Sequence, residues 1–409
     1  MRLKSPVHLS RGLTLVTAGT VIAGFAGFAA LQAGPASADP HQVYTVVGSD
    51  TIQDVWNQFA LDEGANLIGS WNAVNPVSQV ADDTITPNNA AGGQCSFTRP
   101  NGSTQGESAL RKSVNQSTGA AQLAIAPGPN CVDWSRSSSG PGNDQKNDGQ
   151  LVFIPFGIDA VTGAISSAAS SALATEANQL TIAQLTTLYS GCTNVTMADG
   201  SVLNPNGNAT GTQIPITLYL PQSGSGTAKF WASKMGNFSL SSLPSCVHQT
   251  ILAGPNAGTM VEEHDGTAVT SDPTGYMPFS IARWIANRNG FGTDLRHSAV
   301  LVDISPNVSP AAPVSPFDNG NSATGNLNTN FPITREVYDI IPFANVTSGM
   351  TGFNSQEAQL LAGTTSVLCR DIITITNYGF ALLPSSSTTF DACGATTPNL
   401  RAFGSRPAA

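Results

Sequence analysis

The chain has 409 residues, with 17 Lys and Arg against 26 Asp and Glu and a net charge of −9 at pH 7. This acidic balance excludes general binding to nucleic acid or to anionic membranes, which requires clustered basic residues. Hydrophobic residues make up 40% of the chain, which is too many for an intrinsically disordered chain.

The first 38 residues have the pattern of a secretory signal peptide. Three basic residues precede an apolar run from Leu13 to about Ala33, and Ala36-Ser37-Ala38 fits an A-x-A cleavage site. We expect cleavage after Ala38, which leaves Asp39 as the first residue of a secreted, extracellular protein. The apolar run is also long enough to cross a bilayer, so retention as a membrane anchor is the alternative.

Removing residues 1–38 from 409 leaves 371 residues, about twice the usual size of a domain, so two domains are expected. The removed segment has three basic residues and no acidic one. The rest of the chain therefore carries 14 basic and 26 acidic residues, a net charge of −12. An anion can bind to such a chain only where local donors outweigh the overall charge.

Strand and helix patterns alternate along the chain, which predicts an α/β fold. Residues 43–47 are a short β-prone run, and Gly48-Ser49-Asp50-Thr51 follows as a polar turn. Apolar residues between 52 and 60 then recur at helical spacing. Ser49, Asp50 and Thr51 are all suitable N-caps, so the first unit is a strand, a polar turn and a helix.

A second polar turn, at residues 102–107, is expected to begin a helix through a capping box of Thr104 and Glu107. A strand pattern at 214–220 leads into a third turn, Ser223-Gly224-Ser225-Gly226-Thr227. Further helices are expected at residues 181–189, 228–235 and 281–287.

The six cysteines all follow the signal-like segment, and their number is even. Export leads to an oxidising compartment, where such cysteines are usually paired. Of the fifteen connectivities that six cysteines allow, we expect the sequential one, because each bond then closes a loop within one region. The expected disulfides are Cys95–Cys131, Cys192–Cys246 and Cys369–Cys393. A metal site is not indicated, since no C-x-x-C spacing occurs and His is scarce.

The turns at residues 48–51, 102–106 and 223–227 combine Gly with Ser or Thr at the expected start of a helix. The first turn of a helix has free N–H groups and a partial positive charge, and small residues let a ligand approach the backbone. Several such turns facing one point would hold a small oxyanion without many Lys or Arg side chains. Each Ser or Thr can instead be only a helix cap, and this alternative stays open for all three turns.

These turns resemble the anion-binding loops of the phosphate-type substrate-binding proteins of ABC transporters. Gly48–Thr51 is similar to the first loop of that family, Asn101–Gly106 to the second, and Ser223–Thr227 to its strongest signature. Four other segments also resemble the family: Asp133–Ser138, Leu180–Gly191, Gly275–Met277 and Phe331–Arg335. The segments keep the order of the family and cover most of the chain after residue 38.

The resemblance implies a two-lobed, periplasmic-binding-protein-like type II fold of the α/β class, with the ligand in the cleft between lobes. Two interlobe crossings would lie near Ile154–Gly157 and Phe331–Pro332. Lobe one would comprise residues 39–156 and 330–409, and lobe two residues 157–329. Carried over by position, ligand contacts would come from Ser49, Thr51, Ser103, Ser225, Gly226 and Thr227. We add the neighbouring polar residues Asp50, Thr104, Arg136 and Ser137 to this candidate set.

The chain departs from the family pattern at two positions. Pro221-Gln222 stands where the family has an Arg before the third turn, and Ser138 stands where it has an Asp. Either Arg136 or Lys229 could supply the missing positive charge. The expected ligand is therefore phosphate, another oxyanion or a small polar organic molecule, and no cofactor is expected.

No enzymatic site is indicated by the sequence. The third turn fails the G-x-S-x-G pattern at Ser223, and no G-x-x-x-x-G-K motif occurs. His264 and Asp265 are adjacent in the chain and are not expected to face one point. Glu262, Glu263 and Asp265 are interpreted as a solvated acidic loop.

We therefore expect a monomeric solute-binding protein, with no enzymatic activity and no nucleic-acid partner. It would carry a small oxyanion, phosphate first, to an ABC permease. The alternative is a secreted or surface protein with the same fold that serves adhesion, signalling or sequestration of a small polar ligand. The alternative is favoured by the absence of a cysteine near the cleavage site, which rules out a bacterial lipid anchor there.

Overall fold

The computed structural model describes residues 42–64, 66–88, 93–114, 123–207, 209–306 and 312–403. The expected signal peptide and its cleavage site lie outside these residues. Among the helices that the structure describes, none is long and apolar enough to cross a membrane.

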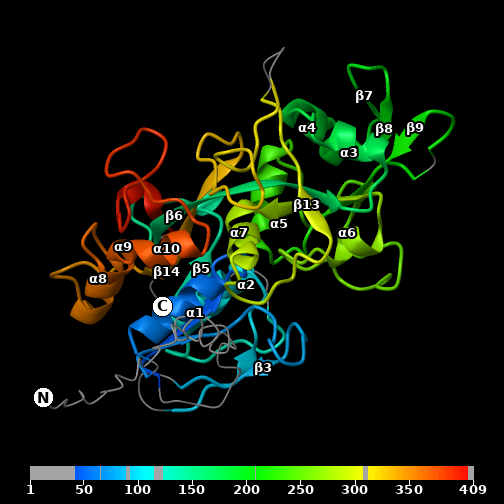
Figure 1. Ribbon diagram of the computed structural model, residues 1–409. Helices are drawn as coiled ribbons and strands as arrows, with labels where there is room; N and C mark the ends of the chain where they lie inside the picture. Colours follow the sequence, from blue (N-terminus) through cyan, green and yellow to red (C-terminus); the bar gives the residue numbers. More distant parts are fainter. Residues whose placement is uncertain are drawn as a thin grey trace, which may run out of the picture. The chain divides into compact units, whose positions relative to one another are not determined.

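A mixed sheet of ten strands organises the described residues, in the order β11-β10-β12-β6-β14-β5-β1-β2, with β13 and β15 also pairing with β6. Strands β5, β6, β13 and β14 of this sheet are labelled in Figure 1. Its strands are β1 (Tyr44–Gly48), β2 (Ile68–Ser70), β5 (Trp134–Ser137), β6 (Leu151–Ser166), β10 (Thr217–Tyr219), β11 (Val247–His248), β12 (Gly275–Ser280), β13 (Ala299–Leu301), β14 (Thr334–Pro342) and β15 (Arg401–Ala402). Two small sheets are formed by β3 (Thr84–Ile85) with β4 (Phe97–Thr98), and by β7 (Val195–Thr196), β8 (Val202–Asn204) and β9 (Gln213–Pro215).

Strand β6 joins the two ends of the main sheet. Residues Leu151–Ala160 pair with β14, and residues Val161–Ser166 pair with β12 and β13. Every residue of β6 is buried, which fits its near-continuous apolar sequence. The proposed lobe boundary at residues 156–157 falls within this strand and stays a prediction.

Parallel strands at each end of the sheet place the polar turns. Strand β1 runs parallel to β2 and β5, and β10 runs parallel to β11 and β12. In open α/β sheets, ligands bind beyond the carboxyl ends of such strands. The turn at 48–51 follows the carboxyl end of β1, and the turn at 223–227 follows that of β10.

The helices are α1 (Gln53–Asp62), α2 (Ser103–Ser113), α3 (Ser171–Ala177), α4 (Ile182–Gly191), α5 (Gly226–Lys234), α6 (Thr267–Ser271), α7 (Ile281–Arg288), α8 (Ser355–Leu361), α9 (Val367–Arg370) and α10 (Ile372–Asn377), with 3₁₀ turns η1 (Gly142–Asp144) and η2 (Pro398–Leu400). Helices α1, α4, α5 and α7 match the helical patterns in the sequence within two residues. The prediction of a single strand at residues 214–220 is wrong. This stretch contributes to two short strands, β9 and β10, which belong to different sheets. Pro215, at the end of β9, has no N–H for a continuous ladder.

Two aromatic clusters fix the helices that follow the first and third turns. In the first cluster, the Trp56 ring on α1 lies 5.8 Å from the Trp134 ring on β5. In the second, the Tyr189 ring on α4 lies 5.6 Å from the Trp231 ring on α5. The Tyr189 hydroxyl donates to the carbonyl oxygen of Tyr219, the last residue of β10, at 3.0 Å. These contacts hold the start of each helix in place relative to the sheet.

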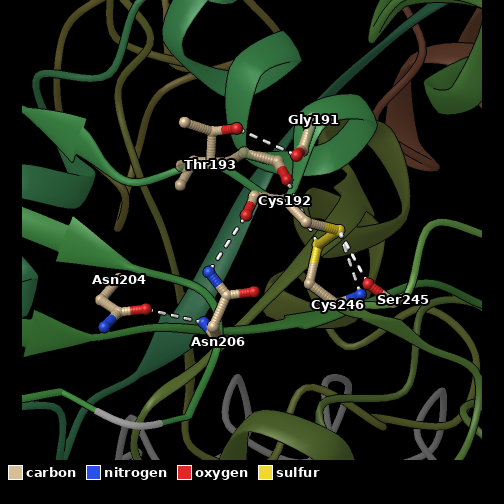
Figure 2. Close-up of a disulfide and its surroundings, with 8 residues drawn as sticks. Gly191, Cys192, Thr193, Asn204, Asn206, Ser245 and Cys246 are labelled. Carbon is tan, nitrogen blue, oxygen red and sulfur yellow. Dashed lines mark hydrogen bonds between the residues drawn. A yellow bond between two sulfur atoms is a disulfide. The ribbon is translucent and has the colours of Figure 1, made fainter.

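The three disulfides have the sequential pairing predicted from the sequence: Cys95–Cys131, Cys192–Cys246 and Cys369–Cys393. Figure 2 shows the second of them, at the end of α4. Cys192 is the C-cap of α4, with a left-handed φ of 47°. Its carbonyl oxygen accepts a hydrogen bond from Asn206 Nδ2 at 3.0 Å (Figure 2). The Cys192–Cys246 disulfide ties the end of α4 to the segment that leads into β11.

Candidate functional site

The hydroxyls of the first two turns are not helix caps. The N-cap of α1 is Ile52 and that of α2 is Gly102, and neither makes a side-chain capping bond. The predicted capping box of Thr104 and Glu107 is therefore wrong, because α2 begins at Ser103, one residue before Thr104. Only the third turn uses a cap, since Ser225 Oγ accepts from Ala228 N at 3.0 Å. The hydroxyls of the first two turns are free to make longer-range contacts.

The second and third turns pack directly against each other. Thr104 N donates to the carbonyl oxygen of Gly224 at 3.1 Å. A methyl group on Gly226 would overlap the hydroxyl oxygens of Ser103 and Ser138. Ser103 Oγ in turn accepts from Ser138 N at 3.1 Å. This close approach explains why the third turn requires glycine next to its hydroxyl residues.

Glu263 links the first turn to the third. Its Oε1 accepts from the Thr51 hydroxyl at 2.7 Å, the Thr227 hydroxyl at 2.6 Å and Thr227 N at 3.3 Å. Only 3% of Glu263 and 1% of His264 are exposed. The interpretation of this segment as a solvated acidic loop is therefore wrong for Glu263. Hydrophilic sequence alone could not reveal that long-range donors bury a carboxylate.

Arg335, from β14, supplies the positive charge of this cluster. Its Nη2 donates to Thr227 Oγ1 at 2.9 Å and to Asp159 Oδ2 at 2.8 Å, and it lies 3.4 Å from Thr51 Oγ1. Arg335 and Asp159 are register partners on β14 and β6, which places the two charges side by side. We call Thr51, Thr227, Glu263, His264 and Arg335 the central cluster.

Sequence reasoning missed Arg335 as a site residue. The sequence feature that could have identified it is an Arg within Thr334–Pro342, a run that otherwise has the pattern of a buried strand. Buried Arg side chains are rare unless they are paired or bind an anion. Within the described residues, neither Arg136 nor Lys229, the two residues considered for this charge, hydrogen-bonds to the Thr51 or Thr227 hydroxyl.

His264 is held as a neutral donor. Its Nδ1 accepts a hydrogen bond from Ser280 N at 3.1 Å, so the ring proton is on Nε2. That nitrogen lies 2.8 Å from Thr51 Oγ1 and 3.0 Å from Glu263 Oε1. Burial lowers the pKa of His264, and Glu263 opposes that shift only in part. A histidine in this tautomer cannot take a proton from the Thr51 hydroxyl, so the pair is not a nucleophile and its base.

The charge of Glu263 is stabilised where it lies. Burial acts to raise the pKa of Glu263, but the hydrogen bond from His264 and the guanidinium of Arg335 outweigh it. The pKa is therefore held well below its usual range, and the carboxylate is ionised. The central cluster thus surrounds an anionic oxygen with hydroxyl, amide, imidazole and guanidinium donors.

The remaining candidate residues have other surroundings. Ser49 is fully buried, and its hydroxyl has no hydrogen-bond partner in the described part of the chain. Burial raises the pKa of Asp50 well above its usual range, against the opposing charge of Arg283. The Arg136 guanidinium donates to the carbonyl oxygen of Trp71, and the Ser137 hydroxyl donates to the carbonyl oxygen of Ser139. The Arg136 and Ser137 side chains thus hydrogen-bond to other residues than those of the central cluster.

Comparison with solved structures gives distant similarities. The chain is 11% identical to a candidate phosphate ABC transporter substrate-binding protein with bound phosphate from Clostridium perfringens, over 83% of this chain and 99% of that one, with a TM-score of 0.45. It is 15% identical to an ABC-type phosphate transport receptor from Vibrio cholerae, over 83% and 100%, with a TM-score of 0.43. A phosphate-binding protein from Stenotrophomonas maltophilia is 14% identical over 84% and 91%, with a TM-score of 0.38.

No protein-family model and no curated protein matches the chain. Identities of 11–15% and TM-scores below 0.5 are too low to assign a ligand to this chain.

Proposed function

We propose that this protein is an extracellular solute-binding protein that holds a small oxyanion at the central cluster. Phosphate is the first candidate, and delivery to an ABC transporter is the proposed role. The division into two lobes, 39–156 with 330–409 and 157–329, belongs to the same proposal. The protein would bind its ligand without transforming it, since His264 is a donor and not a base.

The observation that carries the proposal is the convergence of donors on one anionic oxygen. Two hydroxyls, a backbone amide and an imidazole N–H surround Glu263 Oε1, and Arg335 donates to one of the hydroxyls. These two hydroxyls belong to Thr51 and Thr227, which are among the residues that the resemblance in sequence predicts to contact the ligand. Preorganised donors of this kind are the usual means of binding an oxyanion in a buried site.

Unpartnered polar atoms of the same region also favour a ligand with several oxygens. Within the described residues, the buried Ser49 Oγ and Arg335 Nη1 have no hydrogen-bond partner. A buried donor without a partner costs about 1–3 kcal/mol, and this cost disappears when a ligand oxygen accepts from it. A tetrahedral oxyanion has enough oxygens to use both these donors and those of the central cluster.

Titration of the purified protein with inorganic phosphate tests the proposal. We expect Thr51→Val and Thr227→Val each to weaken binding by about ten- to a hundredfold, because each removes a hydrogen bond to a charged group. Thr186→Val is the matched control, since its hydroxyl bonds within α4 to the carbonyl oxygen of Ile182 at 2.9 Å. Unchanged affinity in both site variants, or an equal loss in the control, contradicts the proposed site.

Salt dependence gives a second test of the same site. Most of the donors are neutral and buried, so affinity should fall only modestly between low and physiological salt. A steep fall would indicate a surface site made of Lys and Arg side chains instead.

A further inference from the structure

The place of a ligand oxygen in the central cluster is taken by the protein itself. Glu263 Oε1 accepts from both Thr51 and Thr227, and His264 Nε2 lies within hydrogen-bond distance at 3.0 Å. These are the donors that the proposed function assigns to an oxyanion. A side-chain carboxylate and an external oxyanion would therefore compete for one set of donors.

The charges of the region prevent the Glu263 carboxylate and an external oxyanion from occupying the site at the same time. Glu263 and Asp159 are acidic, Arg335 is the basic partner of Asp159, and His264 is neutral, so the region carries a net charge of about −1. The nearby Arg283 is already paired with Asp54. Two like charges about 4 Å apart repel each other strongly, and more so when they are buried. An added oxyanion next to an ionised Glu263 would be strongly disfavoured.

We propose that Glu263 is a resident anion that an incoming oxyanion displaces, so that ligand binding is an exchange of one anion for another. This inference rests on the proposed function of the central cluster as an oxyanion site. It adds a residue that sets the affinity by competing with the ligand. With Glu263 withdrawn, Arg335 and Asp159 balance each other and the neutral donors are open to the ligand.

Buried polar atoms without a hydrogen-bond partner explain how an oxyanion can displace the Glu263 carboxylate. The hydrogen bonds from Thr51, Thr227 and His264 all go to Glu263 Oε1, and its buried Oε2 has no partner among the described residues. Arg335 Nη1 and Ser49 Oγ are also unused. A tetrahedral oxyanion would engage more donors than the carboxylate does, and Glu263 would recover its hydration outside the site.

The residues on both sides of Glu263 are held by hydrogen bonds, so its side chain is the part that would move. Val261 exchanges backbone hydrogen bonds with Gln222 and Gln249, at 3.1 and 2.9 Å. His264 has a left-handed φ of 58°, a conformation that disfavours residues other than glycine. Rotation of the Glu263 side chain alone would therefore open the donors while the backbone hydrogen bonds of Val261 and the bond from Ser280 N to His264 stay in place.

The test compares phosphate binding by the wild-type protein with that by Glu263→Gln. The Gln side chain keeps an acceptor for Thr51 and Thr227 but lacks the competing charge, so we expect its affinity for phosphate to rise at least tenfold. Glu263→Ala should also bind more tightly, which covers the case in which the Gln variant folds poorly. Glu262→Gln is the matched control, because that neighbouring carboxylate bonds to Asn101 Nδ2 and not to the two threonines. Its affinity should change less than threefold.

The outcomes separate the two proposals. Equal affinity in wild type and both Glu263 variants overturns the exchange and leaves the oxyanion site standing. Weaker binding by both variants also overturns it, because Glu263 would then be a contact of the ligand. A similar gain in Glu262→Gln would trace the effect to overall charge and overturn it as well. If none of the four proteins binds phosphate or sulfate, the proposed function itself fails.

Discussion

Thr51 and Glu263 are 212 residues apart in the sequence, yet the Thr51 hydroxyl donates to Glu263 Oε1 at 2.7 Å. Thr227 donates to the same oxygen, so one carboxylate oxygen joins the turn after β1 to the turn after β10. Arg335 adds a third element, β14, to this junction. The site is thus assembled from segments at the two ends of the main sheet, whose central strands are β6 and β14.

Ser225 and Thr227 should respond differently to the loss of their hydroxyls. Ser225 caps α5, so Ser225→Ala should lower the free energy of unfolding by about 1 kcal/mol and change phosphate affinity little. Thr227→Val should weaken binding by about tenfold or more. Denaturant unfolding and phosphate titration of both single variants check this. Loss of affinity in Ser225→Ala alone would contradict the assignment.

Gly226→Ala should disturb the contact between the second and third turns. The added methyl group would overlap the hydroxyls of Ser103 and Ser138, and overpacking of this kind costs about 1–3 kcal/mol. We expect lower stability in thermal unfolding and weaker phosphate binding. Gly128→Ala is the control, since a methyl group there meets only Cys131 Sγ, at 3.8 Å. Wild-type behaviour of Gly226→Ala would mean that the turns are not in close contact.

Stability should depend on pH through Glu357 on α8. Burial, with the charge of Asp133, raises the pKa of Glu357 to about 7 from an ordinary value of 4.5. The folded protein therefore holds a proton that the unfolded chain releases. The free energy of unfolding should fall as the pH rises from about 4.5 to about 7, and the Glu357 contribution should level off above that.

Urea unfolding of Glu357→Gln across this pH range measures the contribution. The Gln variant cannot ionise, so its loss of stability between pH 4.5 and 7 should be smaller than that of wild type, by an amount on the order of 3 kcal/mol. Glu63→Gln, in the residue that follows α1, is the control and should keep the wild-type slope. If the free energies of unfolding of wild type and Glu357→Gln fall in parallel with pH, Glu357 is not responsible for the pH dependence of stability.

The Cys192–Cys246 disulfide should contribute strongly to stability because it closes a long loop. Its partners are 54 residues apart, and the loop-entropy relation gives about 4 kcal/mol for that length. The Cys192→Ser and Cys246→Ser double variant should lose up to this amount in denaturant unfolding. The corresponding double variant at Cys369 and Cys393, which are 24 residues apart, should lose about 3.5 kcal/mol. A larger loss of stability in the Cys369 and Cys393 variant would indicate that loop length is not the main determinant of how much each disulfide stabilises the protein.

The sequence by itself determined the local features of this protein. Helical periodicity predicted α1, α4, α5 and α7, and the Thr181 cap of α4 with its partner Gln184 is a contact between near neighbours. The sequential disulfide pairing also agrees with the structure. These features depend on interactions over short stretches of chain, or on cysteine number and order, which a sequence displays directly.

Only the tertiary structure decided which polar residues share one site. Local patterns favoured Ser225 as a ligand residue and Glu263 as a solvated one, whereas the fold makes Ser225 a helix cap and buries Glu263 between Thr51 and Thr227. Arg335 reaches the site because the register of β14 on β6 sets it opposite Asp159. The burial of a charge depends on donors brought from distant segments, and no local pattern encodes which segments those are.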